Sequence, residues 1–359
     1  MKGGFSFCGI DIADIGLEYA PENKDTYVYA PAKTQIQEET FDGHDGGYFY
    51  GVTKEPKEFT LRCYFENQNI SNGILTRANS LFRRGRSGML IFKRRPWCYY
   101  YATVTDTNND DLYNYENGLF VVTMKAYYPY ARGLKVNGRL FCNLLTDPNH
   151  NEVMQNTGLL EKEAMVLPTS FNNIPDENII LYNPGTEYAN VGLVIAGQAG
   201  DGVVIKNLTT GESCRYIGFN TEEGEEIFTD GINGKIVKRS SDNTSFAFLY
   251  HDYGYINLKP AYPILRDIYA SYNNQTVTTT NILYEDESEK EWYVGKYIFL
   301  GNAWYKITEC HDKHTLFIDK PASSGIEKTC IVLMNEIQII PTQGTNLTKI
   351  SFIYEPTFA

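Results

Sequence analysis

Apolar and polar residues alternate over most of the chain, and this two-residue period is typical of half-buried β-strands. Tyrosine, which favours strands, occurs 28 times. The pattern therefore predicts a mostly β protein. Toward the N-terminus the clearest strands are EFTLRCYFE (58–66), GMLIFKRR (88–95), YYYATVTDT (99–107) and GLFVVTMKAYY (118–128).

One segment follows the helical period instead. Ser71 or Asn72 can cap the start of NGILTRANSLFRR (72–84), and Gly85 stands where a helix ends. One helix among these strands predicts an α+β domain over residues 1–142, with the helix packed on a β-sheet. The apolar stripe that would face the sheet consists of Ile74, Leu75, Ala78, Leu81 and Phe82.

The second half of the chain has three parts. Residues 143–175 are polar, lack strand alternation and are predicted to be a linker with a short helix near 159–165. Residues 176–262 contain several short strands separated by turn signals, and residues 336–359 contain two more. Together they predict one β-sandwich.

Residues 263–335 have a strand pattern that differs from that of the sandwich, and they are predicted to be a small β-barrel inserted into it. Insertions at exposed loop tips are well tolerated. Because the chain leaves the sandwich near Pro260 and returns near Glu336, the two ends of the insert should lie close together. The candidate core residues of the insert are Val294, Tyr297, Phe299, Trp304, Ile307, Leu316 and Ile318.

Composition narrows the possible functions. The 359-residue chain has a formal net charge of −12, which argues against a free-standing nucleic-acid binder. No apolar run is long enough to cross a bilayer and the N-terminus reads as a strand, so neither a membrane span nor a signal peptide is expected. The seven cysteines stand alone, without a CxxC pair, which predicts reduced thiols rather than a disulfide framework.

Three segments have residue types that could do chemistry. Asp42, His44 and Asp45 in FDGHDGGYFYG (41–51) could bind a metal or relay protons, but no further donors are identifiable in the sequence. A loop shaped by its glycines is the preferred interpretation. DTNNDD (106–111) departs from the calcium-loop pattern, and CHDKH (310–314) reads as a hairpin turn.

Catalytic motifs of the G-x-S-x-G, HExxH, P-loop and GxGxxG types are absent from the sequence. No catalytic residue, metal ligand or cofactor is therefore predicted, and the chain is not expected to be an enzyme.

A basic stretch runs from Arg77 to Arg95 without an acidic residue. In isolation it could follow a nucleic-acid backbone. The segments TEEGEE (221–226) and EDESEKE (285–291) show that the same chain also offers acidic surface, so salt links between proteins are favoured. The predicted protein-contact residues are Arg83, Arg84, Arg86, Arg94 and Arg95.

The order of these segments resembles the siphophage distal tail protein family. FSFCGIDIADIGLEY precedes the Gly-Asp-rich loop, which has His44 where the family has a basic residue between glycine and Asp-Gly. EPKEFTLRCYF, the short helix and GMLIFKRRPWCYYYATVTD follow, and Tyr128-Pro129-Tyr130-Ala131 ends the first domain. LYNPGTEYANVGLVIAG and VVIKNLTTGES resemble the first strands of the family's galectin-like sandwich. The match spans nearly the whole chain except 263–335.

This resemblance implies a structural role in the virion. Family members form a hexameric ring that joins the tail tube to the hub or tail-associated protein, and DNA passes through its lumen. The glycine-rich loop would belong to a hairpin that reaches a neighbouring subunit, so the expected ring interface is Asp42, Gly43, His44, Asp45, Gly46 and Gly47. The location implied is the virion tail tip after assembly in the host cytoplasm, without membrane insertion. An acidic chain suits a DNA channel, because like charge keeps DNA from adhering.

Two other functions remain open at this point. The sandwich and the insert could bind host carbohydrate, with Trp292 and Trp304 as a stacking platform, although such a fold does not guarantee sugar binding. A cell-wall hydrolase would need paired carboxylates in a cleft, which a sequence cannot identify. The insert is expected to dock other baseplate proteins, such as a receptor-binding protein, rather than bind sugar directly.

Overall fold

The computed structural model describes most of the chain. The described residues are 4–19, 32–40, 47–65, 72–96, 98–107, 118–133, 135–136, 139–140, 170–183, 185–229, 236–240, 246–248, 251–252, 256–260, 263–301 and 303–358. They form two compact units. Unit 1 contains the described residues up to 140 together with Thr357 and Phe358, and unit 2 contains those from 170 to 356.

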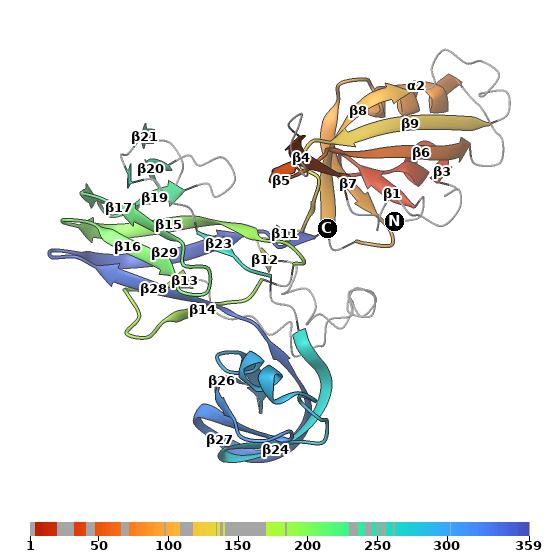
Figure 1. Cartoon of the computed structure of the whole chain (residues 1–359). Helices are drawn as coiled ribbons and strands as arrows, with labels where there is room; N and C mark the ends of the chain where they lie inside the picture. The colour runs from red at the N-terminus through yellow and green to blue at the C-terminus, as the bar shows by residue number, and fades with distance from the viewer. Residues whose placement is uncertain are drawn as a thin grey trace. The chain divides into compact units, whose positions relative to one another are not determined.

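Unit 1 is built on one antiparallel sheet with the strand order β2-β1-β7-β8-β9-β6-β3 (Figure 1). Strand β10 pairs with β8, and β30 pairs with β10. The strand bounds are β1 Phe5–Phe7, β2 Ile10–Asp11, β3 Leu17–Tyr19, β6 Lys57–Phe65, β7 Ser87–Phe92, β8 Cys98–Thr107, β9 Leu119–Ala126, β10 Ala131–Gly133 and β30 Thr357–Phe358. Two short ribbons, β4 (Thr34–Thr40) with β5 (Gly47–Lys54) and β11 (Lys135–Val136) with β12 (Arg139–Leu140), complete the strands described here.

The helix α2 (Asn72–Leu81) lies over one face of this sheet, as the apolar stripe predicts (Figure 1). Ala78 and Leu81 are buried in it, and the ring of Phe82 stacks on Phe7 and contacts Phe120. The helix ends at Leu81, three residues before the predicted end, because the chain then enters a turn in which the Arg86 amide donates to the Arg83 carbonyl. Gly85 lies in this turn with a φ of +83°, which favours glycine. A 3-10 turn, η1 (Ile12–Ile15), precedes β3.

Unit 2 contains two antiparallel sheets whose buried side chains meet. The Tyr216 hydroxyl on one sheet and the Thr229 hydroxyl on the other are 2.8 Å apart, and both residues are buried. One sheet has the order β13-β29-β15-β19-β20-β21, with β18 and β23 paired to β15, and the other has the order β14-β28-β16-β17-β22.

The strands of unit 2 have the following bounds. The first sheet comprises β13 Ser170–Phe171, β15 Ala189–Ala199, β18 Phe219–Asn220, β19 Glu225–Thr229, β20 Ile236–Ser240, β21 Phe246–Phe248, β23 Asn257–Leu258 and β29 Asn346–Tyr354. The second comprises β14 Ile179–Leu181, β16 Val203–Asn207, β17 Ser213–Tyr216, β22 His251–Asp252 and β28 Asn335–Pro341.

The insert is a bent four-stranded sheet within unit 2. It consists of β24 (Pro263–Thr279), β25 (Tyr297–Leu300), β26 (Ala303–Cys310) and β27 (Thr315–Val332), with the 3-10 turn η5 (Glu287–Trp292) between β24 and β25. Strands β25, β26 and β27 pair with one another in a circuit, and β24 pairs with β27.

The observed fold is mostly β, as the sequence predicts, and it differs from the expected boundaries at two places. Strand β13 pairs with β29, so residues 170–171 belong to the sandwich and not to the expected linker. Strand β30 belongs to the sheet of unit 1, although the sequence pattern assigns all of 336–359 to the sandwich. The rest of the expected linker up to 169, and with it the short helix near 159–165, lies outside the described residues.

Candidate assembly surfaces

The most exposed apolar surface of unit 1 is the ribbon of β4 and β5. Its large side chains are half or more exposed, and the ribbon pairs with no other strand among the described residues. An isolated two-stranded ribbon is at best marginally stable in water, so this one is expected to need a covering partner. The exposed large side chains are Ile36, Tyr48, Phe49, Tyr50 and Val52.

These side chains occupy both faces of the ribbon. Ile36 opposes Val52, and Glu38 opposes Phe49 after a bulge, so all four share one face. Tyr48 opposes Glu39, and the Tyr50 hydroxyl donates to Glu39 Oε2 at 2.9 Å, which places both tyrosines on the other face. Gly51 at the bulge has a φ of +146°, a conformation that side-chain-bearing residues rarely adopt.

Only one of the six expected ring-interface residues is among the described residues. Asp42, Gly43, His44, Asp45 and Gly46 lie outside the described residues, and Gly47 is the first residue of β5, opposite Thr40. The sequence therefore locates the hairpin, whereas the flanking strands contain exposed aromatic side chains that sequence reasoning did not select.

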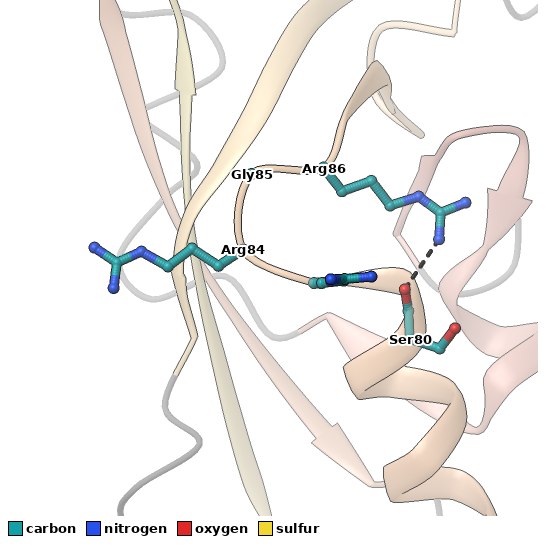
Figure 2. A pocket seen from close by; sticks show the side chains of 5 residues that line it. Ser80, Arg84, Gly85 and Arg86 are labelled. Carbon is teal, nitrogen blue, oxygen red and sulfur yellow. Dashed lines mark hydrogen bonds between the residues drawn. The ribbon is translucent and has the colours of Figure 1, made fainter.

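Three of the expected basic contact residues form a loop between α2 and β7. Arg83, Arg84 and Arg86, with Ser80 and Gly85, line a shallow depression (Figure 2). Arg86 Nη1 donates to the Ser80 carbonyl oxygen at 3.0 Å, while Arg84 points the opposite way. Among the described residues, the side chains of Arg83 and Arg84 have no hydrogen-bond or ion-pair partner.

The other two expected contact residues separate. Arg94 is exposed, but Arg95 is 8 % exposed and lies on the buried side of the sheet, so its assignment to an exposed contact patch is wrong. The cause is the turn after β7, in which the Arg95 amide donates to the Phe92 carbonyl and directs the side chain inward.

Arg95 belongs to a buried polar cluster that sequence reasoning missed. Lys57 Nζ donates to the Tyr100 hydroxyl at 2.8 Å, and the Lys57 side chain is buried. Burial lowers the pKa of Lys57 to about 8, and the Arg95 guanidinium nearby adds to this effect. Burial likewise raises the pKa of Cys98 to about 11 and that of Tyr100 to about 12. These side chains are too buried to meet a large partner, so the cluster is structural.

The two expected contact tryptophans of the insert also differ from one another. Trp292 is 60 % exposed at the end of η5, whereas Trp304 is 8 % exposed and packs edge-on against Phe299. Trp304 therefore cannot stack on a partner, and the expected two-tryptophan platform is not assembled. Of the predicted core residues, Val294 is 44 % exposed and that assignment is wrong, while the other six are buried.

Trp304 is buried because the insert packs against the sandwich. A single apolar cluster joins residues of the insert with Ile180 and Tyr182, which lie on β14 and just after it. Strand β25 is buried on both faces: Tyr297 and Phe299 face this cluster, and Ile298 and Leu300 face the separate core of the insert.

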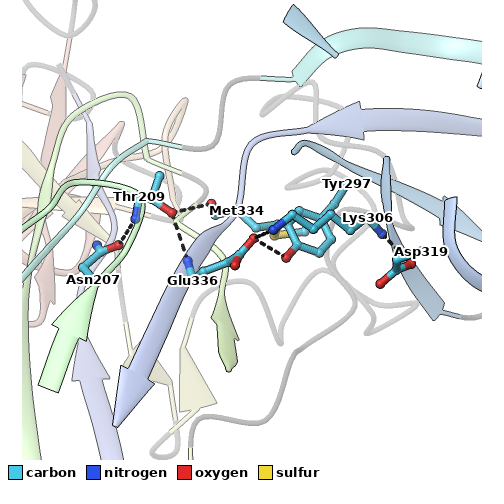
Figure 3. A network of polar contacts seen from close by, with 7 residues as sticks. All are labelled: Asn207, Thr209, Tyr297, Lys306, Asp319, Met334 and Glu336. Atoms are coloured by element: carbon cyan, nitrogen blue, oxygen red, sulfur yellow. Dashed lines mark hydrogen bonds and ion pairs between the residues drawn. The ribbon is translucent and has the colours of Figure 1, made fainter. Parts of the chain in front are cut away.

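Polar contacts fix the same junction (Figure 3). The Glu336 carboxylate on β28 accepts a hydrogen bond from the Tyr297 hydroxyl at 2.8 Å and an ion-paired one from Lys306 Nζ. Burial raises the pKa of Glu336, but these two partners outweigh that effect and hold the pKa below its ordinary value. The hydroxyl of Thr209, on the sandwich, accepts a hydrogen bond from the Glu336 amide at 3.0 Å and donates one to the Met334 carbonyl at 3.2 Å.

The chain passes between the sandwich and the insert at two points, and these two points lie side by side, as predicted. Asn335, which is fully buried, donates from Nδ2 to the Lys259 carbonyl at 2.9 Å and accepts from the Lys259 amide at 2.8 Å. The Asn335 side-chain oxygen also accepts a hydrogen bond from Asn207 Nδ2 at 3.2 Å. We call this group, with the Glu336 contacts, the insert junction.

The described residues contain no cluster of three His, Cys, Asp or Glu side chains arranged for a metal ion. CHDKH forms the turn between β26 and β27, as predicted, with Cys310 opposite Leu316. No helix in the described part of the chain is long and apolar enough to cross a membrane.

Comparison with solved structures gives matches among phage tail-tip proteins, the class that the order of sequence motifs indicates. One is SPP1 Dit (gp 19.1), presented as a paradigm of the hub adsorption apparatus in phages that infect Gram-positive bacteria. It has a TM-score of 0.46 and 12 % identity, with 93 % of this chain and 98 % of that chain covered.

Two others are chains of the phage p2 baseplate in its activated conformation. The strontium form has a TM-score of 0.33 and 9 % identity, with 92 % of each chain covered. The calcium form has a TM-score of 0.32 and 10 % identity, with 90 % of this chain and 92 % of that chain covered. No family model matches the chain, and neither does any curated protein.

Proposed function

We propose that the chain is a structural, non-catalytic protein of a bacteriophage tail tip that forms a ring through unit 1. In the complete particle the ring would connect the tail tube to the hub and dock other adhesion proteins, with DNA passing through its lumen. The order of sequence motifs supports this class of function. The observation that carries the proposal is the β4–β5 ribbon, which exposes large apolar side chains on both faces and therefore needs a protein partner.

The proposed ring contains six copies and assembles in the host cytoplasm. Closed cyclic symmetry requires a head-to-tail interface, in which one surface of each copy meets a different surface of the next. A ribbon that pairs with no other strand of the described residues suits such an interface because its exposed side chains remain available to a neighbour. The formal charge of −12 suits a ring around DNA, since like charges repel.

The test is the mass of the full-length protein in solution, measured by light scattering after size exclusion. A ring of six copies should have six times the mass of the 40.9 kDa chain. Deletion of residues 42–47 should leave a folded protein that forms no ring. Phe49→Asp should do the same, because a charge at this 66 %-exposed position would have to be desolvated in the interface.

Ile326→Asp is the matched control, because Ile326 is 79 % exposed on strand β27 of unit 2. This variant should assemble normally. A wild-type protein that remains monomeric at all concentrations, or rings that tolerate both hairpin changes, would refute the proposal.

A further inference from the structure

The turn at residues 83–86, between α2 and β7, exposes positive charge in an acidic chain, and we call it the arginine loop. Arg86 is held by its hydrogen bond to the Ser80 carbonyl, whereas Arg84 points away from it (Figure 2). Arg83 and Arg84 are exposed and have no hydrogen-bond or ion-pair partner among the described residues. Two such guanidinium groups fit a partner surface that is rich in carboxylates.

The chain has two acidic segments, and its own lysines partly neutralise one of them. In TEEGEE (221–226), Glu225 Oε2 lies 2.6 Å from Lys238 Nζ, and Glu226 Oε2 lies 3.3 Å from Lys349 Nζ. Two of the four carboxylates of this segment are therefore already paired, which reduces the charge that the segment can offer to a partner.

The other acidic segment, EDESEKE (285–291), keeps its charge. It has five carboxylates, and none of them takes part in an ion pair within the described part of the chain. Glu287 and Glu291 lie on the η5 turn, and both are exposed. Of the two segments, the η5 turn therefore has more unpaired negative charge.

The η5 turn is also held in a fixed conformation. At its start, Asp286 Oδ1 accepts a hydrogen bond from the Ser288 amide at 2.9 Å. Tyr284 precedes the turn and Tyr293 follows it, and both side chains are buried in the core of the insert. A partner that binds the exposed carboxylates therefore pays little to order the backbone that presents them.

We propose that the arginine loop of one copy binds the η5 turn of the next copy in the ring. Arg83 and Arg84 would form guanidinium–carboxylate pairs with Glu287 and Glu291 of that copy. The two surfaces are different parts of the chain, as the head-to-tail contact of a closed ring requires. Their opposite charges favour this orientation of neighbouring copies over its reverse. The inference rests on the proposed ring and names a contact in it other than the β4–β5 ribbon.

A charge-swap mixture of full-length variants tests the contact at low salt. Arg83→Glu with Arg84→Glu reverses the loop, and Glu287→Lys with Glu291→Lys reverses the turn. Each double variant alone should need about tenfold more protein to assemble than the wild type, because like charges then face each other. In an equal mixture, the reversed loop of one variant meets the reversed turn of the other, and the two unchanged surfaces also meet. Light scattering should therefore detect alternating rings at wild-type concentrations.

Three controls keep the result specific. Glu222→Lys with Glu223→Lys makes the same change of charge at exposed positions of TEEGEE and should form rings as the wild type does. One chain with all four changes should also form rings, because its reversed loop meets a reversed turn. Circular dichroism checks folding, and if a double variant does not fold, the single variants Arg84→Glu and Glu287→Lys replace the two double variants.

The outcomes separate this inference from the proposed function. Rings formed by each double variant at wild-type concentrations would overturn the contact and leave the ring itself standing. Equal weakening by the TEEGEE control would overturn the choice of η5 as the partner surface.

A mixture that stays unassembled would overturn the contact between copies. In that case, rings formed by the chain with all four changes would place the pairing within one chain. A wild type that remains monomeric at all concentrations would refute the ring, and the inference with it.

Discussion

Replacing Asn335 by alanine tests whether the insert junction holds unit 2 together. The side chain is fully buried and makes three hydrogen bonds, two to the Lys259 backbone and one to Asn207. Each contributes about 1 kcal/mol net, and each partner left unsatisfied in the interior costs about 1–3 kcal/mol, so the expected loss is roughly 3–5 kcal/mol. In a unit of this size, that loss lowers the melting temperature by roughly 6–20 °C.

Thermal unfolding by calorimetry measures this change, with Asn346→Ala as the matched control. Asn346 is exposed at the start of β29, and its replacement should change stability by less than about 0.5 kcal/mol. Hydrogen exchange should also quicken at the β24 and β28 amides next to the junction. A melting temperature within roughly 2 °C of the wild type would show that contacts other than those of Asn335 hold the two ends of the insert together, and would refute this prediction.

Three further predictions concern single side chains. Trp304→Ala should destabilise the protein by about 3–5 kcal/mol because it empties a packed site, whereas Trp292→Ala should cost under about 0.5 kcal/mol, and acrylamide should quench Trp292 fluorescence far more strongly. Lys57→Met should be more stable than the wild type near pH 7. The folded-state pKa of Lys57, about 8, lies below the ordinary 10.5, so the cost of burying its charge is full below pH 8 and disappears as the pH rises to 10.5. Denaturant unfolding should therefore show that the stability advantage of Lys57→Met over the wild type is smaller at pH 10 than at pH 7. An advantage that is equal at the two pH values would contradict this prediction. Arg84→Glu should weaken ring formation in light scattering, most visibly at low salt, while loss of tight DNA binding in this variant would revive the nucleic-acid interpretation.

The strands and helix of unit 1 could be predicted because their periods are local. In β6 and β9, buried residues alternate with exposed or half-buried ones along the strand, so the sequence itself shows which side chains face the core. The same pattern fails at β25, where YIFL is apolar throughout because the strand is buried on both faces. A continuous apolar run does not say which side chains face which core.

Two site assignments failed for reasons that a sequence does not reveal. Arg95 stands in a run of basic residues that looks like one charged surface, but the turn after Phe92 directs it inward beside Lys57. Trp304 is an aromatic of the kind that often lies at binding surfaces, yet it is buried in an apolar cluster that includes Ile180 and Tyr182, which lie far earlier in the chain. Both outcomes depend on tertiary contacts.

The insert junction also bears on what the insert does. A module on a flexible tether samples many orientations, and a partner that binds it must first restrict them at an entropic cost. Here the hydrogen bonds of Asn335 hold the two ends of the insert together, and the Glu336 carboxylate binds Tyr297 and Lys306. Strand β25 packs one face in the insert core and the other in the cluster shared with the sandwich. The exposed Trp292 is therefore presented in a fixed orientation relative to the sandwich of unit 2. Fixed presentation lowers the cost of docking a rigid protein, whereas binding flexible glycan chains gains less from it. This contrast favours the insert as a docking arm for another tail-tip protein.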